Sequence, residues 1–151
     1  MGAAAIEVSP RRARWLRAIA YGLLAEVATI ITIVVVVVVY KQVVAKGLSE
    51  AEYAAFGQSV GGMLGLVAGT IFTFLFARLL MPKLSRHFVA HGLVVAVTAI
   101  ALSIGGSIAG HHGVPNAYLY ASALKLAAGA LAAFLYERAS RENGRRFAAG
   151  E

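Results

Sequence analysis

The sequence predicts an all-α integral membrane protein with four antiparallel transmembrane helices and with both the N- and C-termini in the cytoplasm. Three observations lead to this fold class: an apolar composition, four long apolar stretches, and an uneven distribution of Lys and Arg. Of the 151 residues, 60% are hydrophobic and 14% are charged, whereas an ordinary soluble domain carries about 25% charged residues. A soluble coiled-coil bundle is therefore excluded.

The four apolar stretches cover residues 16–40, 53–80, 88–110 and 117–136. Each reaches the length of about 20 residues that a helix needs to cross a bilayer. The first stretch is longer than the apolar part of a signal peptide, about 7 to 15 residues, so we expect it to be retained. We therefore predict one four-helix transmembrane domain over 1–151, with a short basic N-terminal arm and a short basic C-terminal tail.

The basic residues predict the orientation, because Lys and Arg near membrane segments stay on the cytoplasmic side. Lys41 and Lys46 fall on one predicted side of the membrane and eleven basic residues on the other. The formal net charge of +7 then reflects this bias and attraction to anionic lipid headgroups. No nucleic-acid partner is implied, since the basic residues are split among three short segments. The eleven are Arg11, Arg12, Arg14, Arg17, Arg78, Lys83, Arg86, Arg138, Arg141, Arg145 and Arg146.

Local signals mark the ends of the middle helices. Ser49, followed three residues later by Glu52, has the spacing of a capping box and predicts a helix start. A helix over 50–80 would rise about 46 Å, which exceeds a hydrocarbon core of about 30 Å, so it must protrude, tilt or break. Pro82 limits its far end, and we expect Ser85 to cap the third helix.

Glu26 and Lys125 are the two charges within the apolar stretches. A charge at membrane depth costs about 2.5 to 3.5 kcal/mol on insertion scales, so such residues usually face a partner, a cavity or a pathway. Glu26 follows Arg17 by nine residues and Lys125 precedes Arg138 by thirteen, which places them roughly 14 and 20 Å along their helices. We therefore predict that the first and fourth helices are neighbours and that the two charges are paired.

Three interpretations of these charges stay open: a structural ion pair, a proton or ion pathway, and unrelated roles. Thr29 shares the Glu26 face of its helix at the 100° step between helical residues, so it belongs to the candidate site. If the charges were far apart, burial would favour their neutral forms and make either a candidate proton carrier.

Small residues recur every fourth position on two helices. In membranes this spacing permits close helix packing. We expect the stripe on the second helix to pack within the chain, to form a homo-oligomer interface, or to line a pore or hinge. The row on the fourth helix contains Lys125, which should therefore face protein. The stripe is Gly57, Gly61, Gly65 and Gly69, and the row is Ala117, Ala121, Lys125, Gly129 and Ala133.

Two histidines, His87 and His91, lie four residues apart on the third predicted helix. This spacing suits a shared metal ion, but no third ligand is evident, so a metal site or a haem is not expected. Interfacial packing and a pH-responsive role stay open. His111 and His112 are predicted in the outer loop.

The chain contains no Cys, and all seven of its acidic residues are Glu. Without a thiol, an Asp or a Ser-His-acid arrangement, a catalytic site is poorly supported and no cofactor is expected. Two functions remain. One is an oligomeric transporter or channel that uses Glu26 and Lys125 for an ion or small polar solute. The other is a noncatalytic membrane module that assembles with copies of itself or another membrane protein. The Ala, Gly, Val and Arg bias fits a bacterial cytoplasmic membrane.

Overall fold

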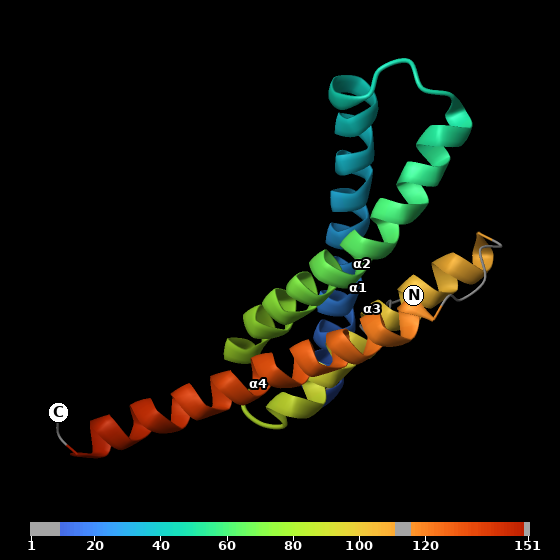
Figure 1. Ribbon diagram of the computed structural model, residues 1–151. Coiled ribbons are helices and arrows are strands. Elements are labelled where there is room, and N and C mark those ends of the chain that lie inside the picture. The colour runs from blue at the N-terminus through green and yellow to red at the C-terminus, as the bar shows by residue number, and fades with distance from the viewer. Residues whose placement is uncertain (1–9, 111–115, 150–151) are drawn as a thin grey trace, which may run out of the picture.

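Four long helices make up most of the computed structural model, which describes the backbone of residues 10–110 and 116–149 and the side chains of 14–110, 116 and 118–143 (Figure 1). Each of the four is long and apolar enough to cross a membrane. A π-helical segment, η1, extends the first helix, and a 3-10 turn, η2, follows the second. In chain order the elements are α1 (Pro10–Val39), η1 (Tyr40–Val44), α2 (Glu50–Leu80), η2 (Met81–Lys83), α3 (Phe88–Ala109) and α4 (Ala117–Ala149).

The capping box at the start of α2 is confirmed. Ser49 Oγ accepts from the backbone N–H of Glu52, and the Glu52 carboxylate accepts from the backbone N–H of Ser49 at 2.8 Å. At the start of α3 the prediction for Ser85 is wrong. The N-cap is His87, whose φ of 58° is left-handed, and it provides no side-chain cap. The helix therefore begins two residues beyond the position that Ser85 could cap, and the Ser85 hydroxyl accepts from Arg14 Nη1 at 2.6 Å.

The helices are arranged so that α1 packs against α2 and α3, and α4 packs against the same two helices. α1 and α4 therefore lie diagonally across the bundle. The prediction that they are adjacent helices is wrong, because each packs mainly against α2 and α3 rather than against the other.

Close helix crossings involve glycines on α1, α3 and α4. A Cβ added to Gly92 of α3 would lie 2.3 Å from the backbone oxygen of Gly129 on α4. A Cβ added to Gly22 of α1 would lie 2.6 Å from Val95 O and from Thr98 Cβ on α3. Only a residue without a side chain permits backbones to approach this closely, so these positions set how α3 crosses α1 and α4.

The core lies in the half of the bundle that carries the basic residues of α1, η2 and α4. Half of the core cluster is alanine, and Leu80, Met81 and Leu84 are its largest members. In the opposite half, the α1–α2 hairpin diverges from the adjoining ends of α3 and α4 (Figure 1). The bundle is therefore closed at one end and splayed at the other. The core cluster contains Ala18, Ala77, Leu80, Met81, Leu84, Val95, Ala132 and Ala133.

The outside of the bundle is apolar. On α1 the valines 34, 35, 38 and 39 are about half exposed, at 54%, 53%, 51% and 47%. Soluble monomers rarely expose apolar patches of this extent. A surface of this kind matches a hydrocarbon environment.

Candidate functional site

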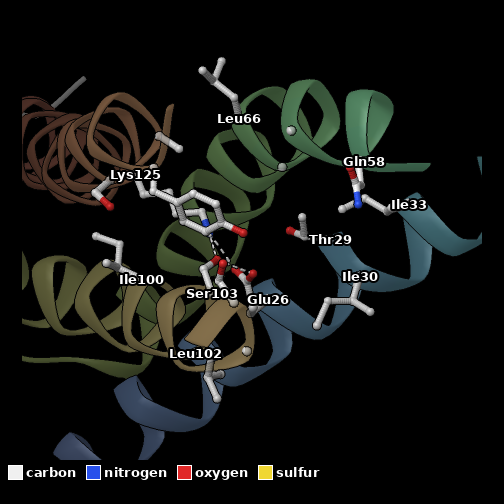
Figure 2. A pocket seen from close by; sticks show the side chains of 18 of the residues that line it. Glu26, Thr29, Ile30, Ile33, Gln58, Leu66, Ile100, Leu102, Ser103 and Lys125 are labelled. Atoms are coloured by element: carbon white, nitrogen blue, oxygen red, sulfur yellow. Dashed lines mark hydrogen bonds and ion pairs between the residues drawn. The ribbon is translucent and has the colours of Figure 1, made fainter. Parts of the chain in front are cut away.

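A cavity of about 720 Å³ lies between the splayed halves of the helices. All four long helices contribute to its wall, which is mostly apolar, with aliphatic residues such as Ile33, Leu66 and Ile100. Gln58 and Ser122 add polar groups. We call it the interhairpin cavity. Figure 2 shows most of its lining side chains.

The two buried charges meet at this cavity. Lys125 Nζ of α4 lies 2.7 Å from Glu26 Oε2 of α1, and the side chains are only 3% and 8% exposed. Ser103 of α3 joins them: its hydroxyl accepts from Lys125 Nζ at 2.8 Å and donates to Glu26 Oε1. Figure 2 shows the three side chains converging from three different helices. The pair thus bridges the diagonal of the bundle.

Both charged groups, the Glu26 carboxylate and the Lys125 ammonium, make hydrogen bonds within this cluster. Each carboxylate oxygen of Glu26 accepts one hydrogen bond, and the ammonium donates two of its three hydrogens. Bonds of this kind between charged groups are about twice as strong as neutral ones, which offsets part of the cost of removing two ions from water. The group carries no net charge, although a third ammonium hydrogen and further carboxylate lone pairs remain available to a ligand.

Neighbouring residues of α1 and α2 fix the position of Lys125. A Cβ added to Gly69 would lie 2.8 Å from Lys125 Cε and 3.7 Å from Thr29 Cγ2, so the glycine provides space for the lysine chain. Thr29, included in the predicted site, is 1% exposed and lines the cavity. Its hydroxyl donates to Ala25 O at 2.9 Å rather than to the ion pair.

Sequence reasoning missed Ser103. A serine within an apolar helix is an ambiguous signal, since its hydroxyl often bonds to its own helix backbone. Thr98 on the same helix does so, donating to Val94 O at 2.8 Å. Only the packing of α3 between α1 and α4 distinguishes Ser103 from Thr98.

The glycine stripe of α2 divides into two parts. Gly69 packs closely on Lys125, but nothing lies within 4 Å of a Cβ added to Gly65. Gly57 and Gly61 have their nearest neighbours at 3.9 Å, on Val37 and Ile33 respectively. Close packing within the chain therefore does not extend along the stripe, because the hairpins diverge there. The homo-oligomer alternative stays a prediction.

The small-residue row of α4 also divides at Lys125. On one side Ala121 lines the interhairpin cavity. On the other side Gly129 contacts Gly92 of α3, and Ala133 is fully buried in the core. The row therefore changes from cavity wall to helix contact at the depth of the ion pair.

The histidines predicted as pH-responsive have different surroundings. His87 is exposed, whereas His91 is 4% exposed and stacks on Trp15 with ring centroids 4.1 Å apart. His91 Nδ1 donates to His87 O at 2.8 Å. Within the described residues, no group of three or more His, Cys, Asp or Glu side chains is placed to hold a metal ion. His111 and His112 lie outside the described residues.

No protein-family model, curated protein or solved structure matches the chain. The interhairpin cavity and its ion pair are therefore the features from which a function is inferred. They bring together Glu26, Lys125, Thr29 and the cavity-lining part of the glycine stripe, while His87 and His91 border a separate small cavity.

Proposed function

We propose that the protein is a membrane carrier for a small polar solute that has no net charge. In this proposal the four long helices span a bacterial cytoplasmic membrane, with the closed, basic end in the cytoplasm and the interhairpin cavity open toward the outside. The apolar exterior supports insertion into a membrane, and the excess of Lys and Arg at the closed end supports this orientation.

The observation that carries the proposal is a cavity that reaches a buried, hydrogen-bonded ion pair and whose lining, among the described residues, ends at that depth. On the far side of Lys125, buried Ala128, Ala132 and Ala133 of α4 join the packed half of the bundle. A channel requires a continuous route, whereas a carrier exposes its site to one side at a time. The arrangement therefore favours a carrier over a channel.

The ion pair also favours a class of solute. Glu26 and Lys125 compensate each other, and a solute with a net charge would leave one buried charge uncompensated, which is strongly unfavourable. A zwitterion avoids this cost, because its ammonium contacts Glu26 while its carboxylate contacts Lys125. The aliphatic wall, including Ile33 and Leu66, suits an apolar side chain on the same molecule. A zwitterion with an apolar side chain is thus the best match.

Uptake into liposomes tests this proposal, with radiolabelled leucine as the zwitterionic probe and arginine and glutamate as charged counterparts. We expect saturable leucine uptake and little uptake of the charged probes. Uptake per folded protein should fall at least about tenfold in Glu26→Gln, because a charge-assisted hydrogen bond contributes about 1.5 to 3 kcal/mol. Lys41→Met, which removes a charge from an exposed ion pair, is the matched control and should retain uptake. Equal uptake by the Glu26→Gln and Lys41→Met variants would contradict a role for the cavity charge, and preference for a charged probe would contradict the solute class.

A second candidate function is a noncatalytic assembly module that accepts a transmembrane helix in the cavity. One observation favours it: the α2 wall is free of side chains at Gly61 and Gly65, where an added Cβ would have no neighbour closer than 3.9 Å. Such a surface permits close approach of another helix. In this case Glu26 and Lys125 are structural, and cross-linking between copies distinguishes it from a carrier.

A further inference from the structure

A second cavity, of about 140 Å³, lies at the basic end of the bundle. It is distinct from the interhairpin cavity and shares none of its lining residues. Its wall combines the start of α1 with the turn that leads into α3. The residues are Arg14, Trp15, Arg86, His87, Ala90 and His91.

Positive charge converges on this cavity from two elements. Arg14 of α1 is held beside the turn by its 2.6 Å hydrogen bond to Ser85 Oγ. Arg86 forms no ion pair within the described part of the chain. Two guanidinium groups beside one small cavity favour a compact oxyanion, which they bind through paired N–H donors.

The N-terminus of α3 adds backbone donors. The 22-residue helix begins after His87 without a side-chain cap, and His91 N donates to His87 O at 3.1 Å. The amides of Phe88, Val89 and Ala90 therefore precede the first helical hydrogen bond and have no acceptor within the helix. Together with the helix dipole, such amides form a common binding site for phosphate groups.

His91 gives an independent indication of a polar ligand site. The residue is 4% exposed, and its Nδ1 is occupied by His87 O. The other ring nitrogen, Nε2, is buried and has no hydrogen-bond partner among the described residues. A buried polar atom without a partner is energetically unfavourable. A phosphate oxygen satisfies a protonated Nε2, and the hydroxyl of a monoprotonated phosphate satisfies a neutral one.

We propose that this cavity binds a phosphate group, with Arg14, Arg86 and the α3 N-terminus as donors and His91 as the buried partner. The group comes from an anionic phospholipid headgroup or from a soluble phosphate. The proposal is independent of solute transport. Under the proposed orientation the cavity lies at the cytoplasmic headgroup level, where a lipid phosphate is available.

The chain has a single tryptophan, and because Trp15 lines the cavity, its fluorescence reports binding without a label. The full chain is placed in micelles of a maltoside detergent, which contain no phosphate. One series then raises the fraction of phosphatidylglycerol, and another adds inorganic phosphate against chloride at equal ionic strength. We expect a saturable change in Trp15 emission in at least one series.

Two charge-matched variants make the test specific. Arg86→Gln removes a guanidinium from the cavity wall, and since Arg86 is exposed the variant should fold normally. Arg17→Gln removes the same charge from exposed Arg17 of α1, which does not line the cavity. We expect Arg86→Gln to weaken binding about tenfold, as for loss of a hydrogen bond to a charged group, and Arg17→Gln to weaken it less than about twofold.

The two series distinguish the sources of phosphate. A response to phosphatidylglycerol alone supports a lipid headgroup, and a response to inorganic phosphate supports a soluble phosphate or phosphate ester. The absence of a saturable response in both series would overturn the proposal. Equal weakening in the two variants would also overturn it, because binding would then follow net charge rather than the cavity.

Discussion

At the scale of single residues, the interaction between Glu26 and Lys125 explains how two charges are tolerated in an apolar bundle. Each is almost fully buried, and Ser103 bonds to both. Removing one partner leaves an uncompensated charge at low dielectric, whereas removing both leaves a neutral site. The loss of stability should therefore depend on whether the second charge remains.

Glu26→Gln and Lys125→Met should each lower the free energy of unfolding by about 3 to 5 kcal/mol. The double variant should lose clearly less than the sum of the two, since residues in one hydrogen-bond network are coupled. Unfolding of the purified chain in detergent, followed by circular dichroism, measures all three. Lys41→Met, at a pair whose side chains are 41% and 85% exposed, should leave stability nearly unchanged, because exposed ion pairs contribute little. Additive losses, or unchanged stability in both single variants, would contradict the coupling.

At the scale of elements, α3 and α4 pack through Gly92 and Gly129, where their backbones are too close for a side chain on either. The added Cβ atoms would lie 2.3 and 2.4 Å from backbone oxygens of the partner helix. Backbone atoms cannot move aside as a flexible side chain does, so any substitution must separate the helices. Gly105 and Gly106 of the same α3 face open space and provide a comparison within one element.

Gly92→Ala and Gly129→Ala should each destabilise the protein by about 1 to 3 kcal/mol, the usual cost of overpacking. Gly105→Ala and Gly106→Ala should be neutral or slightly stabilising, because Ala has the higher helix propensity. Thermal unfolding of the four variants under identical detergent conditions gives the comparison. If all four behaved alike, the close α3–α4 crossing would be contradicted.

At the scale of the whole molecule, the sequence predicts what depends on composition and local spacing. The four apolar helices follow from stretch length, and the start of α2 follows from Ser49 and Glu52. The diagonal arrangement of α1 and α4 depends on crossings that no local pattern encodes. For the same reason the spacing of Gly61 and Gly65 predicts a helix face without side chains but does not predict the cavity opposite it. Ser103 is recognisable as a partner of the ion pair only once α3 is placed between α1 and α4.

We expect a thiol in the splayed half of the bundle to be more accessible to water than one in the closed half. The chain contains no Cys, so single-cysteine variants test this difference. Ser122→Cys places a thiol in the interhairpin cavity, and Ala132→Cys places one in the packed core. Val35→Cys, on the half-exposed apolar surface of α1, is the control for a thiol facing lipid. Intact spheroplasts and inverted vesicles are treated with a charged, impermeant maleimide, with and without leucine.

If the protein is a carrier, the Ser122→Cys variant reacts with maleimide from the outside, and the Val35→Cys control does not react. The Ala132→Cys variant is protected without leucine. It becomes reactive when leucine permits the closed half to open to the cytoplasm. Labelling at 132 in inverted vesicles should then rise at least about tenfold, since a carrier must populate both states and one state is favoured by a few kcal/mol. Protection at 132 under all conditions, together with disulfide cross-links between copies at 122, would favour the assembly module. Labelling of Ser122→Cys only from the cytoplasmic side would contradict the proposed orientation, because the splayed end of the bundle would then face the cytoplasm.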